Sequence, residues 1–354
     1  MSKYTFYSLN SKLYDQMLKD IKDAASYVYL ETYLFQNDAI GREVLALLIK
    51  KAKEGVRVKI LLDSIGSLYL TRRHFKELVS AGGEIAFFKK IRFGSKLWKD
   101  LNQRDHRKIL VIDDRVAFVG SSNIVENFKN WRELNVRIEN STCHLFREIF
   151  LQMFDLAKTH YYSKRKAVKA IKTKEYEIIR DVPSLLYRPV RNRVLEMIRH
   201  SKSKIWIETP YLVPEMKMIR ELMFARRRGV KIKIILPEYA DHKSPDVLNK
   251  HYLAKLCRLG IDCLLYVDRP LHSKLVVADG EKFLFGSANM DYRSFILQFE
   301  IALYGKGGEL LDGVKRHFKE SLKNCVPFDR NAWEKRSLHV KAFEQVLLPV
   351  RYLF

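Results

Sequence analysis

The sequence predicts an α/β protein made of two similar α/β/α halves, each a mixed, mostly parallel sheet flanked by helices, with an active site at the interface of the halves. Three observations support this prediction. Runs rich in β-branched and aromatic residues alternate with segments of helical periodicity, which indicates a sheet covered by helices. The same alternation then occurs a second time. A motif containing His-x-Lys appears once in each half, at His106 and at His272.

The first half, residues 1–161, begins with apolar residues at helical spacing, namely Leu13, Met17 and Ile21. The next run, VYLETYLF, is rich in β-branched and aromatic residues and is typical of a buried strand. Gly55 then ends a helix and precedes a second strand. The predicted elements are helices at 12–27, 41–55, 70–80 and 144–161, and strands at 28–35, 56–63, 84–88, 108–113, 115–120 and 133–139.

Residues 162–176 are basic and poor in large apolar side chains, so they are the expected linker. The second half, 177–325, repeats the order of the first. Glu208 corresponds to Glu31 and His272 to His106, and the offsets of these two pairs are similar but not identical, which indicates an internal duplication with small insertions. The predicted elements are helices at 191–201, 215–228 and 246–259, and strands at 204–212, 230–237, 262–266 and 299–305.

The net charge limits the class of partner. The 354 residues include 65 Lys and Arg against 41 Asp and Glu, a net charge of +24, which attracts nucleic acid or an anionic membrane surface. The four cysteines lack metal-ligand spacing and are expected to be reduced. No run approaches the ~20 apolar residues of a membrane-spanning helix, and no signal peptide is evident. We therefore expect a cytoplasmic protein that is peripheral on the inner face of the cell membrane.

Two segments mix apolar and basic side chains. Residues 89–104 carry six basic residues beside Phe93, Leu97 and Trp98. This mixture is typical either of a solvated loop or of a segment that enters the head-group region of a bilayer, where these three side chains would contact lipid. The C-terminal tail, 326–354, is amphipathic and is compatible with two roles, capping the core or lying on a membrane.

The strongest functional signal is the repeated motif. In the first copy, His106 is followed by Lys108 and Asp113, and then by Ser121 and Asn123 in a Gly-Ser-Ser-Asn sequence. The spacing between the histidine and the asparagine is the same in both copies. A lone His-x-Lys pair carries little information, whereas two copies with the same spacing indicate one composite site. The second copy consists of His272, Lys274, Asp279, Ser287 and Asn289.

These residue types suit an anionic tetrahedral group such as phosphate. Histidine can act as a nucleophile or a proton donor near neutral pH, and a lysine two residues along a strand points to the same side. Two such pairs would hold the charge that develops on phosphorus. The motif serines and asparagines, Ser121, Asn123, Ser287 and Asn289, are the expected phosphate-binding groups. No carboxylate cluster with divalent-metal spacing accompanies them, so neither a metal nor another cofactor is expected.

Carboxylates are expected to support the catalytic groups. Asp113 and Asp279 lie at strand ends, where their side chains should bond to backbone or to groups around the catalytic residues rather than react. Each reacting histidine also needs an acceptor that orients its second ring nitrogen. Glu133 and Glu300 occupy matching places in the repeat, each shortly after its motif and near the start of a strand, and are the proposed orienting groups. Ordinary glutamates at strand edges are the alternative.

The double motif resembles the signature of the phospholipase D superfamily, in which His-x-Lys-x4-Asp and Gly-Ser-x-Asn occur twice. The resemblance extends over nearly the whole chain and points to the bacterial cardiolipin synthases. It is carried by ETYLF (31–35), GREVL (41–45), GVRVKILLD (55–63), RDHRKILVIDD (104–114), WREL (131–134), ETPYLVP (208–214), GVKIKIILP (229–237) and GSANMDYRSF (286–295).

The resemblance implies a phosphatidyltransferase of phospholipid biosynthesis that works in two steps without a cofactor. One histidine attacks phosphorus and forms a phosphohistidine, and the other protonates the leaving alcohol and later deprotonates the incoming one. His106 is the expected nucleophile and His272 the expected acid and base, although the symmetry of the repeat also allows the reverse. Phosphatidylglycerol would be the donor, and a second glycerol-bearing lipid the acceptor.

Two alternatives stay open. A phosphodiesterase or nuclease of the same superfamily would use the positive charge for phosphate contacts with phospholipid or nucleic acid. Two motifs in one chain and the long similarity to the lipid branch make nucleic acid the weaker hypothesis. A catalytically silent binding protein is the third hypothesis and ranks last because both motifs are complete.

Overall fold

The computed structural model describes residues 3–89, 102–159, 169–183 and 187–353. The chain divides into two compact units. Unit 1 comprises Met1–Ala167 together with the short later segment Gln298–Glu300, and unit 2 comprises Val168–Leu297 and Ile301–Phe354. The predicted membrane contacts Phe93, Leu97 and Trp98 lie outside the described residues.

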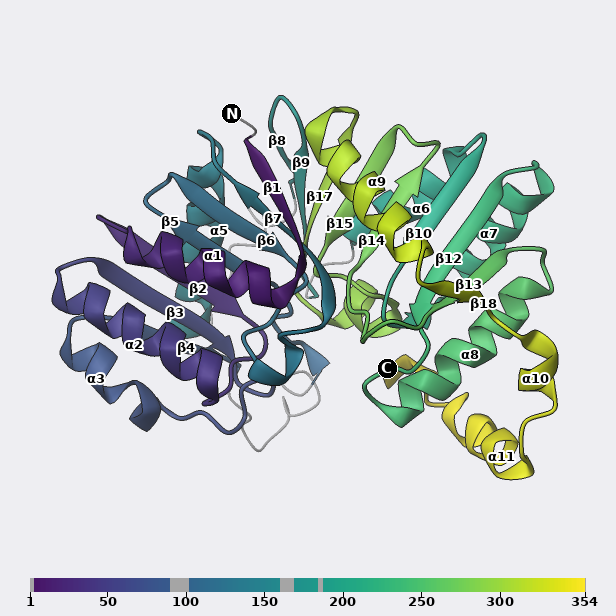
Figure 1. The fold of residues 1–354 in the computed structure, drawn as a ribbon, viewed down its shortest axis with the longest axis horizontal. Helices are drawn as coiled ribbons and strands as arrows, with labels where there is room; N and C mark the ends of the chain where they lie inside the picture. Colours follow the sequence, from purple (N-terminus) through teal and green to yellow (C-terminus); the bar gives the residue numbers. More distant parts are fainter. Residues whose placement is uncertain (1–2, 90–101, 160–168, 184–186, 354) are drawn as a thin grey trace. The chain divides into compact units, whose positions relative to one another are not determined.

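Unit 1 contains a seven-stranded sheet in the order β1-β7-β6-β5-β2-β3-β4 (Figure 1). Only β2, β3 and β4 run parallel to one another, and every other neighbouring pair in this sheet is antiparallel. The prediction of a mixed sheet is confirmed, but the expectation that it is mostly parallel is wrong. The strands are β1 (Tyr4–Leu9), β2 (Tyr27–Thr32), β3 (Arg57–Asp63), β4 (Glu84–Phe88), β5 (Ile109–Ile112), β6 (Val116–Gly120) and β7 (Arg132–Ile138).

Helices cover both faces of this sheet because side chains alternate along its strands. Val28 and Leu30 of β2 face the apolar cluster formed with the first helices of the unit, whereas Tyr29 faces the opposite side and stacks on Phe150 of α5 at 5.1 Å. The helix after β2 starts at an Asp38 cap, whose carboxylate accepts from Gly41 N at 2.9 Å. The helices are α1 (Asn10–Lys22), α2 (Ala39–Lys53), α3 (Lys76–Ser80) and α5 (Cys143–Thr159), with 3₁₀ turns η1 (Arg72–Phe75) and η2 (Glu126–Phe128).

Unit 2 contains a nine-stranded sheet in the order β18-β13-β12-β10-β14-β15-β17-β9-β8. It is mixed as well, and only β10, β12 and β13 are paired in parallel among the pairs described. The strands are β8 (Ile171–Lys172), β9 (Glu177–Asp181), β10 (Lys204–Glu208), β12 (Lys231–Pro237), β13 (Asp262–Tyr266), β14 (Leu275–Ala278), β15 (Lys282–Gly286), β17 (Glu300–Lys306) and β18 (Cys325–Pro327), while β11 (Leu212–Val213) pairs with β16 (Met290–Asp291).

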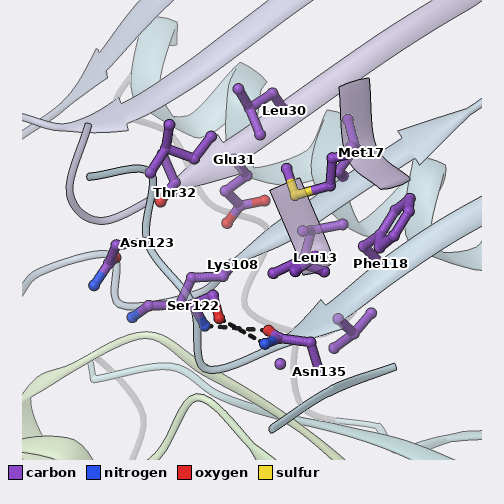
Figure 2. A pocket seen from close by; sticks show the side chains of 15 residues that line it. Leu13, Met17, Leu30, Glu31, Thr32, Lys108, Phe118, Ser122, Asn123 and Asn135 are labelled. Atoms are coloured by element: carbon purple, nitrogen blue, oxygen red, sulfur yellow. Dashed lines mark hydrogen bonds between the residues drawn. The ribbon is translucent and has the colours of Figure 1, made fainter. Parts of the chain in front are cut away.

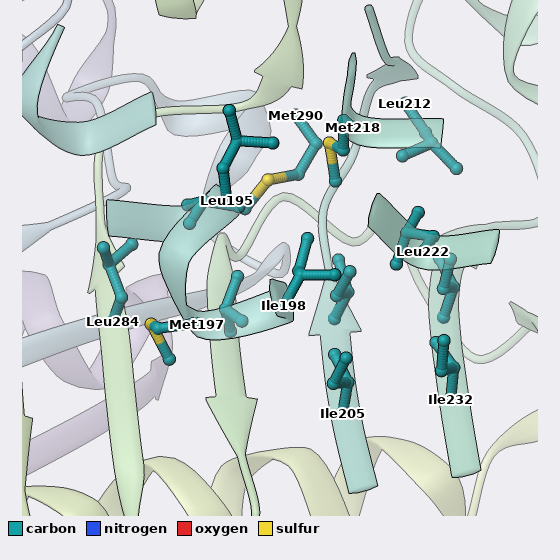
Figure 3. Packing of buried hydrophobic residues seen from close by; sticks show 14 of the residues in the cluster. Leu195, Met197, Ile198, Ile205, Leu212, Met218, Leu222, Ile232, Leu284 and Met290 are labelled. Atoms are coloured by element: carbon teal, nitrogen blue, oxygen red, sulfur yellow. The ribbon is translucent and has the colours of Figure 1, made fainter. Parts of the chain in front are cut away.

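The core of unit 2 is arranged like that of unit 1, with an apolar cluster on one face of the sheet and an aromatic stack on the other. Ile205 of β10 packs with Leu195 and Leu222 from two helices on one face (Figure 3). On the other face Trp206 stacks on Phe318 at 4.8 Å, which is the counterpart of the Tyr29–Phe150 stack. The helices are α6 (Pro189–His200), α7 (Met216–Arg227), α8 (Lys243–Cys257), α9 (Gly308–Leu322), α10 (Arg330–Glu334) and α11 (Leu338–Leu347), with the π-helical segment η3 (Arg293–Leu297) and the turn η4 (Arg351–Leu353).

Two boundaries differ from the prediction. The expected linker 162–176 contains β8, which pairs with β9, because Ile171 continues the sheet of unit 2. The predicted boundary between residues 325 and 326 falls inside β18, which pairs with β13. Further along the tail, helix α11 buries Leu347 against Leu248 of α8. Among the described residues, no helix is both long and apolar enough to cross a membrane.

Candidate active site

The first motif precedes β5, and its backbone is held by the segment 298–300 of the same unit. His106 N donates to Phe299 O at 3.0 Å, and Phe299 N donates to Arg104 O at 2.8 Å. Arg104 is itself fully buried and forms a two-pronged ion pair with Asp63 at the end of β3. Asp63 also accepts from Asp105 N at 2.9 Å. The residue just before His106 is therefore fixed to the carboxyl end of β3.

The His106 ring is oriented by a carboxylate. Its Nδ1 lies 3.0 Å from Oε1 of Glu300, which is fully buried. A hydrogen on Nδ1 that is donated to this carboxylate leaves the lone pair of Nε2 for a nucleophilic attack. The edge of the His106 ring also meets Tyr33, with 5.1 Å between ring centroids. In the sequence Glu300 follows the second motif and was counted from His272, whereas the structure brings it to His106.

Lys108 supplies a buried cation beside this histidine. Its Nζ donates to His106 O at 2.6 Å and lies 5.5 Å from the centroid of the Tyr33 ring. Burial lowers the pKa of Lys108 to about 8, and the nearby carboxylates of Glu300 and Glu133 oppose this effect. A poorly solvated ammonium group gains more from an anionic ligand than a solvated one does.

Asn123 lines the same small cavity as Lys108, which has a volume of about 30 Å³ (Figure 2). The Oδ1 of Asn123 accepts from Leu34 N at 3.2 Å, which leaves its amide N–H groups as donors. Its backbone oxygen accepts from the Tyr14 hydroxyl at 2.8 Å. These two bonds hold the side chain and the backbone of Asn123 in place.

The two motif serines, which were predicted to bind phosphate, use their hydroxyls for bonds within the sheets. Ser121 is fully buried, and its hydroxyl donates to Glu133 and accepts from Leu134 N at 3.0 Å. Ser287 is equally buried, and its hydroxyl donates to Ile301 O at 3.2 Å. Both hydroxyls tie the end of one strand to the next strand, so they do not present a donor to a phosphate.

Asp113 and Asp279 make the expected backbone bonds. The Asp113 carboxylate accepts from the backbone N–H groups of residues 25, 26 and 27 at 2.7–2.8 Å. The Asp279 carboxylate accepts in the same way from residues 202, 203 and 204, and these bonds lower its pKa although burial opposes them. Both aspartates have a positive φ, 54° and 57°. They are turn clamps at the end of the motif strand opposite to the histidine.

The second motif has the same local geometry in unit 2. His272 is 7 % exposed, and the Nζ of the buried Lys274 donates to His272 O. Asn289 is also buried, and its Oδ1 lacks a hydrogen-bond partner among the described residues. An unsatisfied buried amide beside a repeated spacing of His and Lys marks a place where a ligand can bond.

Two buried glutamates near the motifs, Glu31 and Glu208, were used in the sequence only to align the repeats and were not assigned to the site. Glu31 of β2 lies 2.6 Å from Arg107, and burial raises its pKa well above the usual value although Arg107 opposes this. Glu208 of β10 accepts from the Ser273 hydroxyl and lies 2.8 Å from His317 Nε2. The two glutamates occupy equivalent positions in the repeat, and this equivalence could have identified them.

The geometry supports attack on a phosphodiester. Each motif supplies an imidazole, a buried ammonium group and an amide, and the His106 ring is oriented by a carboxylate. Among the described residues, no group of three or more His, Cys, Asp or Glu side chains is placed to hold a metal ion.

Comparisons with known proteins agree with one another. The family described as "Cardiolipin synthase, PLD-like domain" matches residues 17–154 and 194–322. A cardiolipin synthase of Clostridium perfringens (strain SM101 / Type A) is 31% identical over 97% of this chain and 75% of that protein. The major cardiolipin synthase ClsA of Bacillus subtilis (strain 168) is 29% identical over 94% of this chain and 71% of that protein. The crystal structure of phosphatidylserine synthase from Haemophilus influenzae Rd KW20 superposes with a TM-score of 0.79 over 99% of this chain and 95% of that chain, and at 15% identity it shows a shared fold.

Proposed function

Because the chain belongs to the phospholipase D-like cardiolipin synthase family, we propose that it transfers a phosphatidyl group from phosphatidylglycerol to the hydroxyl of a second glycerophospholipid. The general activity, a phosphatidyltransferase of the cardiolipin synthase type, follows from the family. The observation that carries the proposed mechanism is the His106–Glu300 pair, in which a buried carboxylate leaves one imidazole nitrogen ready to attack phosphorus.

In the first step, Nε2 of His106 attacks the phosphorus of the donor lipid and forms a P–N bond. The P–O bond to the terminal glycerol breaks, and the leaving oxygen takes a proton from His272. In the second step, the hydroxyl of the acceptor lipid gives its proton to His272 and attacks phosphorus, and the P–N bond breaks. Two molecules of phosphatidylglycerol thus give one cardiolipin and one glycerol.

Fixed positive groups stabilise the charge that develops in both steps. Lys108 and Lys274 hold the non-bridging oxygens, and the Asn123 amide adds a neutral donor. Glu300 balances the positive charge that appears on the phosphorylated imidazole. Glu133, its counterpart in the repeat, has the corresponding role for the second motif, and its contact with Ser121 holds it in the interior.

The proposed partner is an anionic membrane surface, on which the protein acts from the cytoplasmic face as a peripheral enzyme. The net charge of +24 supports this, because lipid head groups and the substrate itself are anionic. Nucleic acid would satisfy the charge but not the lipid chemistry of the family. Phospholipid substrates are consistent with both the positive net charge and the lipid chemistry of the family.

The first experiment incubates the purified protein with phosphatidylglycerol vesicles and, separately, with plasmid DNA. Cardiolipin and glycerol should appear in equal amounts, and His106→Ala should abolish both products. Cleavage of DNA without lipid turnover would refute the proposal and support the nuclease alternative.

A second experiment tests the covalent intermediate. His272→Ala removes the proton donor of the first step and the proton acceptor of the second but keeps the proposed nucleophile, so radiolabelled lipid should appear slowly as an acid-labile phosphoramidate on His106 without release of cardiolipin. Label on a different residue, or label that survives acid, would contradict the assignment of His106.

A further inference from the structure

The connection between β3 and α3 exposes two large apolar side chains. Leu68 is 58% exposed and Tyr69 is 88% exposed, whereas the next residue, Leu70, is buried. Single exposed apolar residues are common on protein surfaces, but two adjacent ones on a loop tip indicate a surface that meets an apolar environment.

A surface cavity of about 540 Å³ lies beside this loop tip. Leu68, Leu70 and Phe87 form its apolar wall, and Ser64 is one of its polar lining residues. This volume falls within the range of about 300–1,000 Å³ that is typical of small-molecule sites. An apolar wall of this kind suits the hydrocarbon part of a lipid rather than a polar metabolite.

Two arginines, Arg72 and Arg73, line the same cavity and are exposed. Within the part of the chain that the structure describes, neither guanidinium makes a hydrogen bond or an ion pair, whereas the buried Arg104 and Arg107 are paired with carboxylates. Their positive charge is therefore not neutralised by any of the described residues. Guanidinium groups bind phosphate with matched geometry, and this pair stands at the edge of an apolar cavity.

The cavity is connected to the catalytic segment through Ser64. The Ser64 hydroxyl accepts from Arg104 Nη2 at 2.9 Å, and the adjacent Asp63 accepts from Asp105 N at 2.9 Å. Ser67, at the base of the loop, accepts from Phe35 N at 3.1 Å. A ligand in the cavity would thus rest against a wall bonded to the residues that lead into His106.

We propose that this cavity is a lipid-binding subsite that takes one anionic phospholipid of the membrane surface. The upper part of an acyl chain lies against Leu68, Leu70 and Phe87, and Arg72 and Arg73 bind the phosphate. Tyr69 enters the interfacial region of the bilayer, where amphipathic aromatic rings are favoured. The inference rests on the proposed function, because it names where the phospholipid that serves that reaction is held.

The test compares two matched variants of the full chain. Tyr69→Ser/Arg72→Gln removes the exposed aromatic ring beside the subsite and one exposed arginine that lines it. Phe224→Ser/Arg227→Gln removes the same two residue types from α7, where Phe224 is 46% exposed and Arg227 lies over its ring. Neither pair belongs to the catalytic machinery, and thermal melting of both variants checks that they fold.

Binding is measured to vesicles of phosphatidylcholine with phosphatidylglycerol, and turnover is measured on those vesicles and on a water-soluble phosphodiester. The subsite variant should bind vesicles about tenfold more weakly and show a similar rise in the apparent KM for vesicle lipid. Its kcat on the soluble diester should equal that of the wild type, and the α7 variant should match the wild type in every assay.

A photoactivatable phosphatidylglycerol with the reactive group high in one acyl chain gives an independent readout. Label should appear on the peptide that contains residues 64–73, and Arg72→Gln/Arg73→Gln should reduce it. Unchanged vesicle binding and KM in the subsite variant, or equal losses in the α7 variant, would overturn the inference. Loss of plasmid binding with intact vesicle binding would also overturn it and would identify the surface as a nucleic-acid contact.

The failure of the subsite and the failure of the proposed function are distinguishable. Labelling of 64–73 in a wild-type protein that makes no cardiolipin would preserve the subsite and refute the transferase reaction. Normal cardiolipin synthesis with label elsewhere would refute the subsite alone.

Discussion

Glu300→Gln is the sharpest test of the active-site geometry. The change keeps the size of the side chain and an oxygen that can accept from His106 Nδ1, but it removes a full negative charge at 3.0 Å from the ring. Phosphoryl transfer to Nε2 makes the imidazole positive, so the carboxylate stabilises the product of the first step more than the resting enzyme. Glutamine cannot reproduce this difference.

The size of the effect follows from the distance and the burial. Two unit charges 3.0 Å apart attract each other by ~5.5 kcal/mol at an effective dielectric constant of about 20. The neutral hydrogen bond that glutamine retains offsets about 1–1.5 kcal/mol of this lost attraction. The remaining ~4 kcal/mol corresponds to a fall in kcat of about 10³-fold.

The assay follows glycerol release from phosphatidylglycerol vesicles together with formation of the phosphohistidine in a single turnover. Glu43→Gln is the control, because Glu43 is an exposed glutamate on α2. Vesicle binding and thermal stability should be retained by Glu300→Gln. A loss of less than about tenfold in phosphohistidine formation would show that Glu300 does not act through the charge of the His106 ring.

Three further predictions concern groups around the first motif. The pKa of about 8 predicts that kcat/KM falls as Lys108 loses its proton above pH 8, and Lys108→Arg should remove this alkaline fall, measured as a pH profile, even if the rate is lower. Asp113→Ala should lower the free energy of unfolding by about 2 kcal/mol in a urea titration, and Asp279→Ala should do the same, because each clamp loses three backbone bonds; unequal losses would show that the two turns are not equivalent. Arg104→Met should cost about 3–5 kcal/mol of stability, since Asp63 would be left buried and unpaired; a smaller loss would show that water reaches Asp63.

The hydrophobic pattern of a single segment predicted the bounds of a strand or helix well where that segment has a clear periodicity or apolar run. Strands such as VRVKILLD and DCLLY were placed within one residue of their observed bounds, because each is a short apolar run rich in aliphatic residues. The strand direction was predicted less well. A tight turn between β5 and β6 requires an antiparallel pair, and the edge strand β1 adds another, so the parallel strands are a minority in the sheet of unit 1.

In the candidate site, too, some features could be predicted from the sequence and others could not. Spacing alone identified the histidines, lysines and asparagines, because a repeat preserves positions along the chain. It could not identify partners that are distant in sequence, and Glu300 is 194 residues from His106. Spacing also could not show which way the Ser121 hydroxyl points. The sequence assigned this hydroxyl to phosphate, whereas in the structure it bonds to Glu133 and Leu134 of the neighbouring strand.

The duplication also shows how one structural need is met in two ways. Glu31 and Glu208 are buried at equivalent positions, and a buried carboxylate requires a donor. In unit 1 Glu31 forms an ion pair with Arg107, which follows His106, whereas the equivalent residue in unit 2 is a serine that carries no charge and donates a hydrogen bond to Glu208.

The second donor in unit 2 comes from a different element. The matching Tyr29–Phe150 and Trp206–Phe318 stacks align α5 with α9, so the counterpart of His317 is the buried Ile149. Isoleucine offers no donor, and unit 1 therefore depends on the arginine, whereas unit 2 combines a serine with a histidine. In both units the polar side chain nearest to the carboxylate belongs to the residue between the catalytic His and Lys. The buried glutamate consequently anchors the catalytic strand segment in each half, although the chemistry of the bond differs.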